Sequence, residues 1–350
     1  MKVSEYVGLM RKSLKLKKKI LAVGKPGVGK TYGAREAAQV EGFDFISLCC
    51  PLQSPVKIGG YPRPPEHPDG DATHCLFDGI SRAFHATSPT LLFWDDLGMA
   101  GGETLKAIVE MIQFGRIDGR VLPDCVVQCG ATNDIGHGAD VQGLIEPLKT
   151  RWHSIIPVET SVDDVVRYGL GAGWPSDLLA FLRNAPDAVH DWKPSKSMSV
   201  DGATPRGWEY VGQWVNDGIC DHEVIAGCVG KGRATQYLAF RELINELPDI
   251  DAVLASPGSA PVPENPGARY LVAMALASKM GCKNFGACIQ YLQRLPEMFL
   301  AFSVRDAFEA EKRKREAKKL PSGYQPISAS RDFSAWVVSK AGQDILGAMA

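Results

Sequence analysis

The sequence predicts an α/β fold with a parallel sheet in the first half of the chain and helices in the second half. Short apolar runs alternate with helical stretches over residues 20–160, and a glycine-rich loop joins the first run to the first of these stretches. Beyond residue 160 the strand signals fade and helical signals follow one another. Alternating strands and helices are typical of α/β domains with a central parallel sheet.

Composition and charge limit the classes of protein that need to be considered. The 350 residues are 45% hydrophobic, which is ordinary for a globular protein and excludes disorder for the chain as a whole. The 39 basic and 40 acidic residues give a net charge of −1, whereas a dedicated nucleic-acid binder is usually basic. Apolar runs such as residues 270–277 are shorter than the roughly 20 residues of a membrane helix.

The first residues and the cysteines favour a cytoplasmic protein. Residues 1–19 lack the apolar stretch of a secretory signal. The nine cysteines show no repeated spacing of the kind that binds zinc, and Cys49 and Cys50 are adjacent. We expect reduced, buried thiols. A catalytic cysteine is the alternative, although no neighbouring residue supports one.

The elements of the first half follow from the spacing of apolar residues. Near-continuous apolar runs predict parallel strands covered on both faces. Helices are predicted over 31–40 and 103–114; in the second helix Leu105, Ile108, Val109 and Ile112 fall on one face. The predicted strands are 20–24, 43–48, 91–96, 126–133 and 153–159.

The second half is predicted to be helical. Residues 248–268 are rich in Pro, Ser, Gly and Ala and predict an extended connector. The helical segments of the second half are 161–170, 175–185, 205–218, 234–247, 268–280 and 287–302, followed by a charged helix over 309–319.

The basic run at 11–19 is interpreted as the solvated face of an N-terminal helix, with a phosphate or nucleic-acid contact as the lesser alternative.

The most specific feature is a phosphate-binding pattern, G-x-x-x-x-G-K-[ST], between a strand and a helix. It reads Gly24-Lys25-Pro26-Gly27-Val28-Gly29-Lys30-Thr31, and Tyr32 follows it. Glycines allow a tight loop whose backbone N–H groups face phosphate oxygens, and the helix N-terminus adds partial positive charge. Lys30 is expected to reach the β- and γ-phosphates of a nucleotide, and the Thr31 hydroxyl to ligate Mg²⁺. A chance glycine-rich turn is the alternative.

Acidic residues end the buried strand over 91–96. Asp95 is expected to hold the metal, through water, and Asp96 to orient the attacking water as a base. An apolar run that ends in acids is common, so this prediction depends on the phosphate loop before it. The alternative for Asp96 is a helix N-cap or a surface charge.

Three further polar residues follow in an informative order. Asn133 ends a predicted strand and could position water near the γ-phosphate, and Arg151 directly precedes the strand over 153–159. Arg206 follows Pro205, a favourable first residue of a helix. Taken alone, the asparagine could be a turn former and each arginine a surface charge.

Together these motifs resemble the AAA+ ATPases, and most of all the MoxR branch, with relatives among the dynein-related AAA domains. The resemblance covers residues 20–215. It implies that residues 24–31 are Walker A, Asp95 and Asp96 Walker B, Asn133 sensor 1, Arg151 an arginine finger and Arg206 the sensor 2 arginine.

The resemblance also covers two inserted segments and the domain plan. Residues 51–80 resemble a helix-2 insert, and residues 114–124 resemble a β-hairpin before sensor 1, with Asp118-Gly119 as a good hairpin turn. In relatives both face a central pore. The expected plan is an AAA+ α/β core over 1–160, a helical lid over 161–267 and a helical C-terminal extension over 268–350.

The activity that this resemblance implies is ATP hydrolysis with Mg²⁺ in a homo-oligomeric ring, most often a hexamer. Such ATPases remodel or mature a protein partner, often one with a von Willebrand factor A domain. Aspartate stands at position 96 where the family usually has glutamate, so a slowly hydrolysing, nucleotide-gated scaffold is one alternative. A nucleic-acid motor or loader is another, with candidate contacts in the basic run 11–19, Lys57, Arg63, Arg116, Arg120 and 312–319. A GTPase is disfavoured because the sequence has no N-K-x-D motif.

Overall fold

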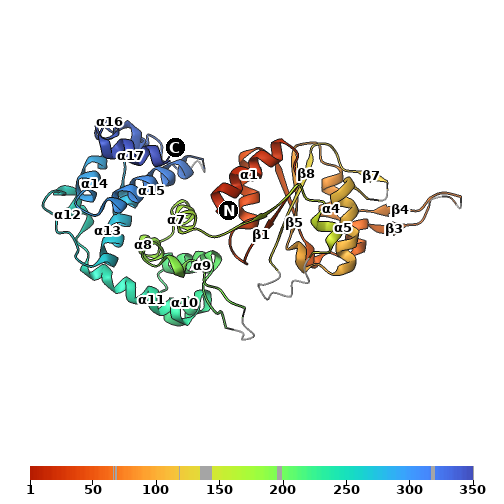
Figure 1. Ribbon diagram of the computed structural model, residues 1–350, viewed down its shortest axis with the longest axis horizontal. Coiled ribbons are helices and arrows are strands. Elements are labelled where there is room, and N and C mark those ends of the chain that lie inside the picture. The colour runs from red at the N-terminus through yellow and green to blue at the C-terminus, as the bar shows by residue number, and fades with distance from the viewer. Residues whose placement is uncertain are drawn as a thin grey trace. The chain divides into compact units, whose positions relative to one another are not determined.

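The computed structural model describes residues 1–65, 67, 69–117, 119–134, 144–194, 199–316 and 320–349. The chain forms two compact units, Met1–Ser161 and Val162–Ala350 (Figure 1). The first unit contains a five-stranded parallel sheet, and each element described in the second unit is helical. The predicted fold class, an α/β P-loop core followed by helices, is confirmed.

The sheet of the first unit has the strand order β2-β5-β8-β1-β9, with each neighbouring pair parallel. Parallel strands end at the same edge of a sheet, so the residues that follow them meet there. The strands are β1 (Ile20–Val23), β2 (Asp44–Cys49), β5 (Thr90–Asp95), β8 (Val126–Thr132) and β9 (Ser154–Pro157). All lie within two residues of their predicted bounds.

Helices cover both faces of this sheet. Leu91 and Phe93 of β5 pack in a core with α1 and α2, while Leu92 and Trp94 pack in a second core with α5. This alternation explains why the strands are apolar almost throughout. The helices are α1 (Val3–Lys15), α2 (Lys30–Val40), α3 (Pro55–Gly59), α4 (Asp78–Phe84), α5 (Gly102–Phe114) and α6 (Glu146–Lys149), with 3-10 turns η1 (Cys50–Leu52) and η2 (Leu97–Met99).

The predicted helix faces are observed with small differences. In α5, Leu105, Ile108 and Ile112 are buried, and Val109 is half-buried against the same core. On the basic N-terminal helix α1, Arg11 and Lys15 are exposed but pair with Glu41 at 2.6 and 2.8 Å. Their charges are therefore partly balanced within the chain.

Two small antiparallel ribbons project from the first unit. The first, β3 (Tyr61–Arg63) with β4 (Thr73–Cys75), lies in the predicted insert over 51–80 and extends away from the sheet as an arm (Figure 1). The second, β6 (Arg116–Ile117) with β7 (Arg120–Val121), lies where the sequence predicts a hairpin; Asp118 of its predicted turn is outside the described residues. The ribbons touch, since Arg120 Nη2 donates to the His74 carbonyl oxygen at 2.6 Å.

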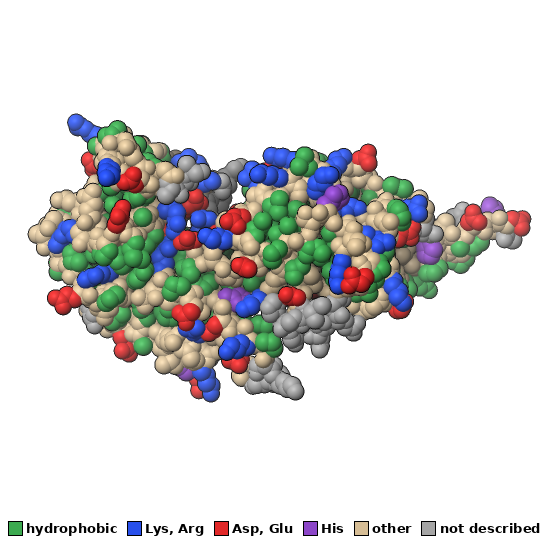
Figure 2. All heavy atoms as spheres, viewed as in Figure 1, with side chains coloured by type: hydrophobic (Ala, Val, Ile, Leu, Met, Phe, Trp, Pro, Cys, Tyr) green, Lys and Arg blue, Asp and Glu red, His purple; other side chains and the backbone are tan. Residues whose placement is uncertain are grey.

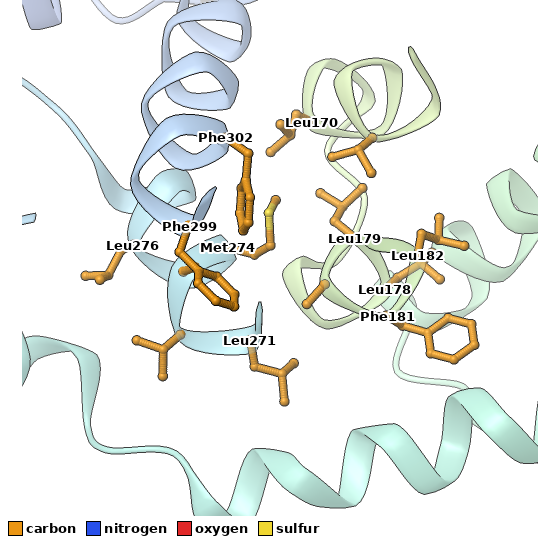
Figure 3. Packing of buried hydrophobic residues seen from close by; sticks show 14 of the residues in the cluster. Leu170, Leu178, Leu179, Phe181, Leu182, Leu271, Met274, Leu276, Phe299 and Phe302 are labelled. Carbon is orange, nitrogen blue, oxygen red and sulfur yellow. The ribbon is translucent and has the colours of Figure 1, made fainter. Parts of the chain in front are cut away.

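The second unit is held by a continuous apolar core. Figure 3 shows Met274 and Phe302 pointing toward Leu170 and Leu179, which brings α7, α8, α13 and α15 together. The helices are α7 (Val162–Ala172), α8 (Ser176–Asn184), α9 (Pro205–Asn216), α10 (His222–Val229), α11 (Lys231–Glu242), α12 (Ile250–Ala255), α13 (Pro266–Lys279), α14 (Phe285–Leu292), α15 (Glu297–Glu316), α16 (Arg331–Val337) and α17 (Lys340–Met349), with 3-10 turns η4 (Pro186–Ala188), η5 (Leu243–Glu246) and η6 (Ile327–Ala329). Core side chains come from both sides of residue 268, and the division there stays a prediction.

An ion-pair network crosses this core. Arg183 of α8, 8% exposed, pairs with Asp163 at 3.2 Å and with Asp306 of α15, which is 2% exposed. Its guanidinium also lies 4.5 Å from the centre of the Phe302 ring. Asp163 in turn pairs with Arg305 at 2.5 Å. Burial raises the pKa of Asp306, and the facing arginines oppose this.

One prediction in the second unit is wrong, and one predicted helical segment is interrupted by a break. The predicted connector over 248–268 contains α12, because Asp249 caps it by accepting from the Asp251 backbone N–H at 3.2 Å and Val253 is buried. The segment 287–302 is two helices, since Pro296 lacks an N–H and cannot continue α14. The separately predicted charged helix is the end of α15 as far as Glu316, and 317–319 lie outside the described residues.

The expectation of buried thiols is wrong for two cysteines. Cys49 is exposed because it ends the edge strand β2, where burial alternates along the strand. Cys75 is exposed because it lies in the projecting ribbon. As for membrane insertion, each described helix is too short or too polar to cross a bilayer.

Candidate nucleotide-binding site

The phosphate loop connects β1 to α2 at the carboxyl edge of the sheet. Gly27 has φ 75° and Gly29 has φ 101°, a region that favours glycine. A Cβ atom at Gly24 would collide with the Val158 carbonyl oxygen, so this first glycine is required by close packing against the end of β9. A positive φ or a close backbone contact therefore explains why glycine stands at each of these three positions of the predicted pattern.

Lys30 brings the loop and the end of β8 together. The residue is 7% exposed, and its Nζ donates to the carbonyl oxygens of Gly24 and Lys25 at 2.8 and 3.0 Å. Nζ also donates to Asn133 Oδ1 at 2.8 Å. Asn133 is itself 8% exposed. The ammonium group and the amide predicted to face the γ-phosphate are thus neighbours, although 103 residues separate them.

Thr31 and Asp95 form the candidate metal site. Thr31 Oγ1 lies 2.9 and 3.0 Å from the two Asp95 carboxylate oxygens. Burial raises the pKa of Asp95, and the hydrogen bond from Thr31 opposes that rise. A hydroxyl and a carboxylate at this separation fit Mg²⁺, which proteins commonly hold with one or two carboxylates plus substrate phosphates. Across the described ranges no group of three or more His, Cys, Asp or Glu side chains is placed to hold a metal without such phosphates.

Asp96 has a left-handed backbone. Its φ and ψ are 50° and 41°, and it is one of two non-glycine residues with positive φ in the described chain, the other being Lys17. Its N–H donates to Asp95 Oδ1 at 3.1 Å, and its carbonyl accepts from the Met99 N–H at 3.0 Å. The half-buried side chain sits between β5 and η2. A strained conformation of this kind is found at functional sites when the surrounding structure enforces it.

Thr132 is a site residue that the sequence reasoning missed. Its hydroxyl accepts from the Gly98 N–H and donates to the Asn133 carbonyl, each at 3.1 Å. It therefore ties the turn after Asp96 to the end of β8. The signal in the sequence was a hydroxyl residue directly before Asn133.

Cys50 lies beside these acids at the carboxyl edge. Burial, together with the negative charges of Asp95, Cys49 and Asp96, raises the pKa of its thiol far above the ordinary value. A thiol with a raised pKa is a poor nucleophile at neutral pH. The arrangement argues against a catalytic role for this cysteine.

The remaining loop residues have different environments. Val28 is 5% exposed and packs in the core with α1 and α2, whereas Tyr32 is 39% exposed. Lys25 is exposed, and Pro26 is half-buried. Tyr6 of α1 packs against Gly33, where a Cβ would lie 2.9 Å from its ring. Burial raises the pKa of Tyr6 well above its ordinary value.

Arg151 lies at the opposite edge of the sheet from the phosphate loop. It precedes β9, whose Ser154 pairs with Ile20 at the start of β1, while the loop follows the end of β1. A strand rises about 3.3 Å per residue, so the four residues of β1 separate the two edges by about 13 Å. Its Nε donates to Gln113 Oε1 at 2.8 Å, and its Nη1 donates to the Pro147 carbonyl oxygen.

Arg206 belongs to the second unit. It lies in the first turn of α9, as predicted, and is exposed. Thr204 caps this helix by accepting from the Gly207 N–H at 3.0 Å, and Pro205 is its first residue. Gly207 is buried against the Cys228 carbonyl of α10, which fixes the start of α9 within its own unit.

Comparisons with known proteins add little detail to this site. No protein-family model matches the chain, and no curated protein matches it. It matches solved structures of RuvB from Thermotoga maritima. One point mutant is 15% identical, with 73% of this chain and 81% of that chain covered and a TM-score of 0.38. Another structure, described as a Holliday junction branch migration motor, is 13% identical, with 90% and 86% covered and a TM-score of 0.35. Because these scores are below 0.5, the interpretation of the site rests on the geometry of this chain.

Proposed function

We propose that the chain is an ATP-hydrolysing AAA+ ATPase of the MoxR type that works as a cytoplasmic homo-oligomeric ring. The observation that carries the proposal is the convergence of Lys30, Thr31, Asp95 and Asn133 at the carboxyl edge of one parallel sheet. Lys30, Thr31 and Asp95 are the residue types that phosphate-loop chemistry uses at these places, and Asn133 adds a polar side chain beside Lys30.

The chemistry assigns each side chain a role. Lys30 binds the β- and γ-phosphates, and Asn133 orients the Lys30 ammonium and a water molecule beside them. Thr31 and Asp95 would hold Mg²⁺, which when bound neutralises phosphate charge. Asp96 accepts a hydrogen bond from the attacking water and takes its proton.

Arg151 calls for a second copy of the chain. Because it lies about 13 Å from the carboxyl edge of its own sheet, it is poorly placed to contact its own nucleotide. An arginine supplied by a neighbour can stabilise the transition-state charge and is worth about 10³–10⁵ in rate. We therefore propose a ring, a hexamer as in the family it resembles, in which Arg151 completes the neighbour's site.

The proposed lid and client follow from the resemblance. Arg206 is proposed as the sensor 2 arginine, which reads the γ-phosphate and changes the orientation of the helical lid over 161–267. The ring is proposed to remodel a protein partner, such as one with a von Willebrand factor A domain. The near-neutral net charge supports a protein client.

The nucleic-acid alternative loses some of its candidate contacts. Arg116 pairs with Glu110 at 3.0 Å, and Arg120 donates to the backbone of His74. Arg11 and Lys15 pair with Glu41. Basic side chains that are engaged within the chain are less available to phosphates.

Two variants and their mixture test the proposal. Lys30→Ala should abolish ATP binding, whereas Arg151→Ala should bind ATP normally and lower kcat by about 10³-fold. Mixing the two should restore part of the turnover, because an intact phosphate loop then meets an intact Arg151 from its neighbour. Arg82→Ala, an exposed arginine of α4, is the matched control and should keep wild-type turnover. Normal hydrolysis by Arg151→Ala would refute the finger.

A further inference from the structure

Helix α5 links the candidate catalytic acids to Arg151. It begins at Gly102, just after η2, which follows Asp96. Its 13 residues span about 20 Å at 1.5 Å per residue, which takes it from the carboxyl edge of the sheet to the amino edge. Leu105, Ile108 and Ile112 are buried against the sheet along this path. The helix is therefore a stiff connection between the two edges.

The last turn of α5 is fixed by two side chains, one from β8 and one from Lys19, which directly precedes β1. Gln128 of β8 donates to the Met111 carbonyl at 2.8 Å and accepts from Trp94 Nε1 at 3.1 Å. Trp94 directly precedes Asp95. The Lys19 ammonium donates to the carbonyl of Ile112 and, at 3.4 Å, to that of Gln113, where a cation also suits the helix dipole.

This fixed turn presents the side chain of Gln113 to Arg151. Gln113 Oε1 accepts from Arg151 Nε at 2.8 Å, and the Pro147 carbonyl accepts from Arg151 Nη1. On either side of the arginine, Leu148 and Trp152 are 0% and 7% exposed and pack in the α5 core. The backbone of Arg151 is thus anchored, and Gln113 sets the direction of its guanidinium.

The amide of Gln113 is a suitable hydrogen-bond partner for Arg151, whose guanidinium must also be able to bind phosphate. An amide oxygen is neutral, so it orients the arginine without cancelling its charge. A carboxylate at the same place would form a charge-assisted, bidentate pair and would compete with phosphate. Glutamine therefore holds the side chain in place while leaving its full charge available.

We propose that Gln113 is a positioning residue for Arg151 and that α5 connects it to the acids of its own subunit. The inference rests on the proposed function, in which Arg151 acts on the nucleotide of a neighbouring copy. Through α5, the subunit that supplies the arginine also controls how that arginine is presented.

The test compares Gln113→Leu and Gln113→Glu with Gln39→Leu, a matched control at the exposed end of α2. Gln113→Leu should lower kcat about tenfold, equal to about 1.4 kcal/mol, with unchanged affinity for ATP. Gln113→Glu should lower kcat as well, because it retains the arginine. In the Arg151→Ala background, Gln113→Leu should have no further effect, which a general loss of folding would not reproduce.

Mixed rings locate the effect. Gln113→Leu placed in the Lys30→Ala subunit, which supplies Arg151, should reduce the restored turnover about tenfold. The same change in the Arg151→Ala subunit, which supplies the phosphate loop, should not. If Arg151→Ala slows hydrolysis but Gln113→Leu does not, the positioning role is wrong while the proposed function stands. If the wild-type protein neither binds nor hydrolyses ATP, the proposed function fails and the positioning role fails with it.

Discussion

Because Asp96 has a left-handed backbone, substitutions there can distinguish its effect on stability from the effect of its carboxylate on catalysis. Placing an L-residue in this region costs about 1–2 kcal/mol, and glycine escapes that cost. Glycine also makes the unfolded chain more flexible, which offsets about 0.5–1 kcal/mol of the gain. We therefore expect Asp96→Gly to unfold with a free energy about 1 kcal/mol larger than Asp96→Ala, although both lack the carboxylate.

The assay is denaturant and thermal unfolding of the full chain, read with ATP turnover. A difference of 1 kcal/mol shifts the Tm of a unit of this size by about 2–4 °C. Both variants should lose about 10²–10⁴ in kcat if Asp96 orients the water. Asp96→Asn is the control: it tolerates the same backbone and should retain stability while losing turnover.

Equal stability of Asp96→Gly and Asp96→Ala would refute the left-handed conformation. Wild-type turnover in either variant would refute the role of the carboxylate. The same backbone bears on Asp96→Glu, which restores the acid usual in the family. Because aspartate is tolerated in this region better than glutamate, we expect that change to lower stability whatever it does to the rate.

Two further predictions concern packing and pH. Gly24→Ala should destabilise the first unit by about 1–3 kcal/mol, because its Cβ would meet the Val158 carbonyl; thermal unfolding measures this, and an unchanged Tm would contradict the close approach. Burial alone would raise the pKa of Asp163, but Arg305 and Arg183 outweigh it and lower the pKa. Its stabilising contribution is therefore present above its ordinary pKa of about 3.9 and is lost as pH falls through the lowered value. Asp163→Asn should cost about 0.5 kcal/mol at about pH 7, after allowance for its exposure, and almost nothing at about pH 2; an equal cost at both would contradict the ion pair.

The parts of the site that depend on local sequence could be predicted. The loop over 24–31 and the acids after β5 follow from short patterns with strict backbone and charge requirements. The parallel strands followed from apolar runs, because a sheet covered on both faces has little room for polar residues.

The rest depended on contacts between distant segments. The bonds of Thr132 to the Gly98 turn, and of Gln113 to Arg151, join elements that only the fold brings together. Helix α12 was not predicted, because the composition of 248–268 favours an extended connector. The cap at Asp249 and the burial of Val253 stabilise a short helix there despite the nearby prolines. Pro296 was a local signal that should have divided the segment 287–302.

The strand order also has a consequence for how the first unit folds. In the sheet, β1 lies between β8 and β9, and both of these strands come much later in the chain. By contrast, β2 and β5 pair with each other, and both precede β8 in the chain. The strand that leads into the phosphate loop therefore has no sheet neighbour until β8 is in place, and the contact of Lys30 with Asn133 closes a long stretch of chain. To form a contact that closes a long loop, the chain must lose conformational entropy before it gains the energy of the contact. A nucleotide would therefore bind only the nearly completed unit. Its binding should lower the unfolding rate of the unit far more than it raises the folding rate.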